Sequence, residues 1–195
     1  MAEGVMPAAG RWPLLIGCAA LAISGLAAAA WWYARRQRAG SIPSRLRRSA
    51  EDLLSGVLIP HVEGGQIHLE HVVLTRQGIV VVDLRDAAGH VFGSESMQEW
   101  TVLARNRRYT FANPLPALYD RLAAVRRLVP DVPVQGVVVF KPGAVFSKGF
   151  PPNVALLDGL LDEIGRVSEA PAAPAAEALA DAWRRLRREA VNAPH

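Results

Sequence analysis

The sequence predicts an α/β (α+β) fold in which helices flank a mixed β-sheet. Two apolar runs rich in β-branched residues, 79–84 and 134–140, are typical of strands buried on both faces. Segments with apolar residues at helical spacing lie before, between and after these runs. The resulting order is helix, several strands, helix, strand, helix, and 195 residues have room for one medium domain plus appendages.

Local patterns define the expected elements. The expected helices are residues 44–55, 114–129, 153–167 and 175–191. The expected strands are residues 57–62, 66–75, 79–84, 90–92, 100–103, 109–111 and 134–140. Gly56 is expected to cap the first helix, and Gly78 is expected to turn the chain between two neighbouring strands.

A transmembrane helix is expected at residues 14–34. The run from Leu14 to Tyr33 contains twenty residues and no charge, and as a helix it would span roughly 30 Å, the thickness of the hydrocarbon core of a bilayer. An aromatic belt is expected at Trp31, Trp32 and Tyr33. Six arginines follow within residues 35–48 and only Arg11 precedes the run, so the positive-inside rule predicts a cytoplasmic domain.

Two other interpretations of this segment are weaker. A cleavable signal peptide would carry its basic residues before a shorter apolar run, whereas here they follow it. A lipoprotein processing box ending at Cys18 would need the apolar run before the cysteine, but most of it comes after. Cys18 is the only cysteine, which excludes an intrachain disulfide and a cysteine-rich zinc site.

The basic pI of about 9.8 comes mostly from the N-terminal region. Residues 1–38 carry four arginines and one glutamate, a net charge of +3, and the whole chain has +4, which leaves +1 for everything after residue 38. The basic excess therefore follows membrane topology and gives no independent argument for nucleic-acid binding.

Changes in composition divide the chain. The expected segments are an N-terminal tail (1–13), the transmembrane helix (14–34), a basic linker (35–43), the folded domain (44–167), an Ala/Pro linker (168–174) and an amphipathic helix with its tail (175–195). In the last helix an apolar stripe of Leu179, Trp183 and Leu186 lies among arginines. It is expected to dock on the domain, with an anionic membrane surface as the alternative.

A candidate site lies at 70–85. Because side chains alternate along a strand, Asp83 and Arg85 point to one face, and the Gly78 turn makes the strand of Glu70 their neighbour. Two carboxylates on adjacent strands can share Mg²⁺ or Mn²⁺. Such a metal would activate a water molecule to attack a phosphodiester bond. Arg85 would hold the attacking water or stabilise the pentavalent transition state, and Glu51, near the end of the first helix, would be a further metal ligand.

The alternative from spacing alone is that Glu70 and Arg85 are exposed and that Asp83–Arg85 is a surface ion pair worth under about 1 kcal/mol. A zinc site is not expected, because strand alternation puts His68 and His71 on opposite faces. Gly89 and Gly93 are expected in turns or bulges rather than in a phosphate loop. Lys141 and Lys148 lie in a loop after the strand at 134–140, where either could approach a phosphate.

Motifs from about residue 45 to residue 140 resemble those of a known family. They are Ala50-Glu51, Glu70-His71-Val72-Val73-Leu74, Gly78-Ile79-Val80-Val81-Val82-Asp83-Leu84-Arg85, Gly89-His90-Val91-Phe92-Gly93, Trp100 and Phe111-Ala112-Asn113-Pro114. Their order is similar to that of the NERD (nuclease-related) domain, which often occurs joined to bacterial transmembrane helices. The resemblance implies a PD-(D/E)xK nuclease-like fold, with DNA or RNA as partner. Together with the apolar run at residues 14–34, it predicts a single-pass protein of the bacterial inner (cytoplasmic) membrane, with the lipid bilayer as a further partner.

The departures from the family fall on the chemistry. Where the family has Asp, Glu and Lys, this chain has Glu70, Asp83 and Arg85, and Pro116-Ala117 stand where a Gln is common. A carboxylate displaced by ~1 Å can lose on the order of 100-fold in rate, and Arg85 cannot take up a proton. Two hypotheses follow: a Mg²⁺- or Mn²⁺-dependent nuclease with a variant site, or a catalytically inactive binding or scaffolding module at the membrane.

Overall fold

The computed structural model describes residues 40–61, 63–169 and 176–193. The expected transmembrane segment, residues 14–34, lies outside these ranges. Within the part that is described, no helix has the length and apolar character needed to cross a membrane. Residues 42 to 193 belong to one compact unit.

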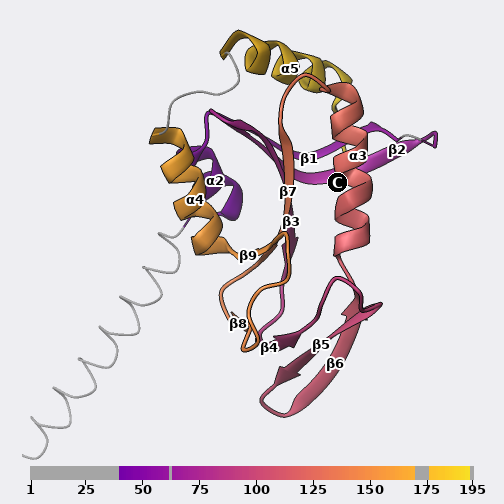
Figure 1. Ribbon diagram of the computed structural model, residues 1–195, viewed down its shortest axis with the longest axis vertical. Helices are drawn as coiled ribbons and strands as arrows, with labels where there is room; N and C mark the ends of the chain where they lie inside the picture. Colours follow the sequence, from indigo (N-terminus) through magenta and orange to yellow (C-terminus); the bar gives the residue numbers. More distant parts are fainter. Residues whose placement is uncertain (1–39, 62, 170–175, 194–195) are drawn as a thin grey trace, which may run out of the picture. The chain divides into compact units, whose positions relative to one another are not determined.

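A six-stranded mixed sheet is the centre of the unit (Figure 1). Its strands, in spatial order, are β10 (Val191–Asn192), β1 (Asp52–Pro60), β2 (Gln66–Thr75), β3 (Gly78–Arg85), β7 (Val134–Phe140) and β9 (Val154–Leu156). The pairs from β10 to β3 are antiparallel, and those from β3 to β9 are parallel. The β-branched runs of β3 and β7 are central strands, as their composition predicts.

Helices cover both faces of this sheet (Figure 1). On one face lie α3 (Leu115–Leu128) and α5 (Ala176–Glu189), which pack on the larger apolar core. On the other face α2 (Ile42–Ser49) and α4 (Leu157–Glu169) pack on a smaller core. The stripe of α5 is buried, and Trp183 Nε1 donates a 2.8 Å hydrogen bond to Oδ2 of Asp52 in β1, so this helix docks on the domain.

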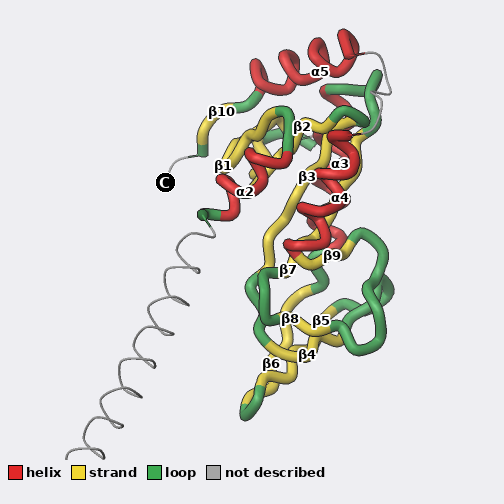
Figure 2. Tube along the Cα trace, turned by 90° about the vertical axis from the view of Figure 1, so that its left-hand side faces the viewer, coloured by secondary structure: helices red, strands yellow, loops and turns green. Residues whose placement is uncertain are grey.

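A second sheet of four strands extends from the end of β3 and β7 (Figure 2). Its order is β6 (Arg107–Ala112), β5 (Glu99–Ala104), β4 (Gly89–Phe92) and β8 (Ala144–Val145). Trp100 is fully buried between the two sheets and stacks on Phe140 of β7 at a ring-centroid distance of 6.1 Å. A Cβ on Gly93 would lie 2.1 Å from the Trp100 ring, so this glycine makes room for the tryptophan.

The sequence interpretation was wrong at four points. Residues 52–55 belong to β1 rather than to the first helix, because they pair with β2 from Leu74 to His71. Gly56, with φ of +62°, is therefore inside a strand and is not a helix cap. Residues 154–156 form β9 before α4 begins, and the strands from residue 89 to residue 112 form their own sheet.

Candidate functional site

The candidate site lies where β2 and β3 separate. Their ladder runs from Thr75–Gly78 to His71–Val82, and the next residue of each strand is Glu70 and Asp83. Beyond the ladder the backbone N–H of Leu84 donates a 2.7 Å hydrogen bond to Oε2 of Glu70. The structure therefore brings the two predicted carboxylates together, but one oxygen of Glu70 already accepts a hydrogen bond from the backbone of β3.

Asp83 is at the bottom of the site, with 1% of its surface exposed. Its Oδ2 accepts a 2.9 Å hydrogen bond from Nη1 of Arg121, which reaches down from α3. The guanidinium of Arg121 also donates to the carbonyls of His68 and Ala117. Its three hydrogen bonds fix Arg121 over Asp83 and close the site from the α3 side.

The charges around Asp83 act in opposite directions. Burial raises the pKa of the Asp83 carboxyl, and the guanidiniums of Arg121 and Arg85 oppose this effect. The neighbouring carboxylate of Glu70 raises the pKa further, and the net pKa of Asp83 is above its ordinary value. Two carboxylates and two guanidiniums thus form a cluster with a formal sum of zero.

Arg85 is in the cluster but is not paired with Asp83 by a short contact. Its Nη1 donates a 2.7 Å hydrogen bond to the carbonyl of Leu84. The surface ion pair Asp83–Arg85, one alternative from the sequence, is therefore replaced by the buried pair Asp83–Arg121. Arg85 is half-buried.

Glu51 does not join the site. Its backbone N–H bonds to the carbonyl of Leu74, four residues beyond Glu70 along β2 or about 13 Å away at the rise of a strand. Its carboxylate pairs with Arg76 at 3.0 Å. The expected third metal ligand is therefore missing, because residues 50–52 run into β1 and not along a helix.

The residues present do not fit a divalent metal well. Mg²⁺ requires near-octahedral oxygen coordination, and among the described residues no group of three or more His, Cys, Asp or Glu side chains is placed to hold a metal ion. Of the oxygens in the cluster, Oδ2 of Asp83 and Oε2 of Glu70 are already hydrogen-bonded. Oδ1 of Asp83 is buried without a hydrogen-bond partner.

The family model of the nuclease-related domain (NERD) matches residues 32–141, more than half of the 195 residues. The chain belongs to this family. It is also 25% identical over 100 residues to an uncharacterized protein of Bacillus anthracis, and the aligned region covers 51% of this chain. The same region covers 47% of that relative, so the chain spans about half its length. No solved structure matches the chain.

Sequence reasoning missed Arg121 in this NERD domain. The apolar face of α3 consists of Leu115, Leu118, Leu122 and Val125. Arg121 follows Leu118 by three residues and precedes Val125 by four, so helical geometry puts it at the edge of the buried face. A charged residue inside an apolar stripe is the signal that could have found it.

His71 is buried on the other face of the sheet. It pairs with Val82 of the smaller core, and its Nδ1 lies 2.9 Å from Oγ of Ser55. Burial lowers the pKa of His71, and the charge of Asp83 partly offsets this effect, so the imidazole is neutral near pH 7.

The loop after β7 contains the two predicted lysines, Lys141 and Lys148. Lys141 pairs with Asp86 at 3.1 Å, and neither lysine contacts Asp83.

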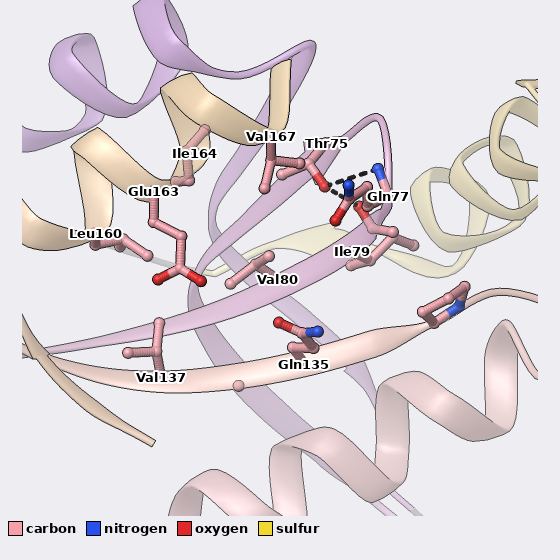
Figure 3. Close-up of a pocket in the computed structure, with 13 residues that line it drawn as sticks. Thr75, Gln77, Ile79, Val80, Gln135, Val137, Leu160, Glu163, Ile164 and Val167 are labelled. Carbon is pink, nitrogen blue, oxygen red and sulfur yellow. Dashed lines mark hydrogen bonds between the residues drawn. The ribbon is translucent and has the colours of Figure 1, made fainter. Parts of the chain in front are cut away.

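A pocket between the sheet and α4 is separate from this cluster. Figure 3 shows Val80 and Val137 of the sheet opposite Leu160 and Ile164 of α4, with the carboxylate of Glu163 at one side. These apolar residues belong to the smaller core, whereas Arg121 approaches Asp83 from α3 on the opposite face. The pocket therefore plays no part in the candidate site.

Proposed function

We propose that this chain is a membrane-anchored NERD protein whose domain is a catalytically inactive binding module. One observation carries the proposal: the guanidinium of Arg121 lies on Asp83, the carboxylate that a catalytic metal would need. A guanidinium cannot polarise a water molecule as a divalent metal does, so the pair keeps the fold of a nuclease-related site without its chemistry.

Charge balance supports the same conclusion. Glu70, Asp83, Arg85 and Arg121 sum to zero without any added ion, so a dication would leave the cluster with two excess positive charges. A metal would also displace Arg121, which would lose three hydrogen bonds. Buried charges are retained only when paired, and here the pairing partner is a side chain.

The anchor in this proposal is residues 14–34. The uncharged run and the arginines that follow it support a single crossing of the bacterial inner membrane with the NERD domain in the cytoplasm. A reporter enzyme fused after residue 195 tests the orientation. Activity of a reporter that works only in the periplasm would overturn the proposed topology.

The decisive experiment follows metal binding and cleavage in the full chain. Protein purified in detergent is incubated with single- and double-stranded DNA and RNA in Mg²⁺, Mn²⁺ or EDTA, and its melting temperature is recorded in the same buffers. We expect no cleavage and no metal-dependent shift for the wild type. We expect Arg121→Gln to gain a Mn²⁺-dependent shift, because Asp83 is then free to bind a cation.

A second candidate function is metal-dependent phosphodiester hydrolysis at the same residues. The buried, unpartnered Oδ1 of Asp83 favours it, because such an atom is an available metal ligand. Mg²⁺ or Mn²⁺ would then be held by Glu70 and Asp83, and Arg85 would contact the phosphate. Metal-dependent cleavage by the wild type that disappears in Asp83→Asn would establish this function and reject the inactive module.

A further inference from the structure

The hairpin formed by β5 and β6 concentrates positive charge at its tip. Between Trp100 and Asn113 the sequence has three arginines, Arg105, Arg107 and Arg108, and no carboxylate. All three are exposed, and no ion pair or hydrogen bond of their guanidiniums is found among the described residues. Elsewhere in the described domain three exposed arginines pair with carboxylates: Arg76 with Glu51, Arg184 with Asp181 and Arg187 with Asp52.

The turn itself places an arginine where glycine is usual. Ala104 pairs with Arg107, so Arg105 and Asn106 are the two turn residues. Arg105 has φ of +23°, in the region that glycine adopts without strain and that other residues rarely adopt. A non-glycine residue at such a position is a cost to the fold, which is understandable if its side chain acts at the tip.

Beside the charges the small sheet exposes a mixed surface. Val145, His90, Leu103 and Arg108 lie side by side across the four strands, and all four are exposed. On the opposite side of the hairpin Tyr109 is 42% exposed. Strand alternation puts Arg107 on the same side as Tyr109, and an arginine beside an exposed ring can bind a sugar-phosphate backbone while a base packs on the ring.

The hairpin also lies at the end of the domain where the candidate site is. The chain passes from Arg85 of β3 into β4 through residues 86–88, and β4 pairs with β5. The four-stranded sheet continues from the same end of the larger sheet (Figures 1 and 2). The hairpin therefore belongs to a sheet that is joined to the end of β3 that contains Asp83 and Arg85.

We propose that the β5–β6 hairpin binds the sugar-phosphate backbone of nucleic acid through Arg105, Arg107 and Arg108. This inference deepens the proposed function, since it names the partner of the module and the surface that contacts it. It needs no metal and no cleavage, and it assigns no base specificity. Tyr109 adds stacking, which favours single strands with accessible bases.

The test uses the full chain in neutral detergent with EDTA, and measures the fluorescence anisotropy of labelled DNA and RNA oligonucleotides at several salt concentrations. The triple variant R105S/R107S/R108S is compared with R48S/R166S/R188S, which removes three exposed arginines from α2, α4 and α5. The affinity falls with salt, so the slope of log K against log salt is negative. If each arginine neutralises one phosphate, this slope should be about 2 to 3 units less negative for the hairpin variant than for the wild type. Tyr109→Ala should weaken single-strand binding about tenfold and leave this slope unchanged.

Several outcomes would overturn the hairpin assignment. They are no binding by the wild type, equal losses in the two triple variants, or a hairpin variant that binds anionic lipid vesicles more weakly but oligonucleotides normally. Unchanged melting temperatures keep misfolding out of the comparison. Cleavage by the wild type in Mn²⁺ would reject the inactive module and leave the hairpin assignment unaffected. Normal oligonucleotide binding by the hairpin variant would reject the hairpin assignment and leave the inactive module unaffected.

Discussion

At the scale of single residues, the charge on Asp83 decides how the site behaves. Its carboxylate is buried, and its two nearest cations come from different elements, Arg121 from α3 and Arg85 from β3. A buried charge that loses its partner is strongly destabilising, even where the intact pair adds little to stability. Arg121 therefore stabilises the fold whether or not the site is catalytic.

Arg121→Met should lower the free energy of unfolding by about 3 kcal/mol, because it leaves the ionised Asp83 unpaired. The loss should shrink at acid pH, where Asp83 is protonated. Urea unfolding of the single variants and of Asp83→Asn/Arg121→Met measures the coupling. Additive effects in this cycle would contradict the assigned pair.

His71 should make the domain sensitive to mild acid. Its pKa is lowered in the folded state from the ordinary value of 6.5, so the unfolded chain takes up the proton first. Stability is therefore complete above pH 6.5 and declines as pH falls toward the lowered pKa. The pKa of Asp83 is raised in the folded state, so its contribution to stability falls as pH rises above 3.8, opposite to that of His71. The contribution of His71 is therefore isolated only by comparison with a His71 variant.

The free energy of unfolding of the His71→Asn variant should decline less steeply than that of the wild type as pH falls below 6.5. Chemical denaturation at a series of pH values checks this expectation. Parallel curves for the two proteins would show that His71 has no lowered pKa.

How far the sequence predicts the site depends on the range of the interaction. Glu70 and Asp83 meet because one glycine turn joins their strands, and a local pattern is enough to predict that. Arg121 lies 38 residues from Asp83, and its contact depends on how α3 crosses the sheet. The prediction that Glu51 lies in the site depends on a helix that ends earlier than expected. The chain turns into β1 there, and Glu51 lies beside Leu74, at the end of β2 away from Glu70.

At the scale of elements, the small sheet depends on the fit between Gly93 and Trp100. Gly93→Ala should destabilise the domain by about 1–3 kcal/mol, because the added methyl group would overlap the indole ring. Gly159→Ala in α4 is a matched control, since nothing lies within 4 Å of the added Cβ and alanine favours helix. Thermal unfolding should move in opposite directions for the two variants, and a neutral Gly93→Ala would contradict this packing.

The first helix shows why an element can be misplaced from sequence. Residues 50–55 contain Ala50, Leu53 and Leu54, which suit a helix as well as a strand that is buried on both faces. The structure puts Leu53 in the smaller core and Leu54 against the larger one, which only a strand allows. Pairing with β2 decides between them, and pairing is not visible in a local window.

At the scale of the whole domain, one core joins both sheets and the docked helix. The larger core contains Trp100 of the small sheet and Trp183 of α5. Trp183→Ala should cost about 3–5 kcal/mol and lower the same unfolding transition that Gly93→Ala lowers. Near- and far-UV circular dichroism should give coincident curves, and separate transitions for the two sheets would contradict a shared core.

The hydrogen bond from Trp183 to Asp52 has a consequence for how the protein is made. It joins residues 131 positions apart, and β10 pairs with β1, the first strand of the domain. The ribosome has therefore synthesised every other described element before α5 can pack on the apolar face of β1 and β10 can pair with the edge of that strand. Until then the nascent chain exposes that face, and chaperones should hold this protein longer than one whose contacts form locally.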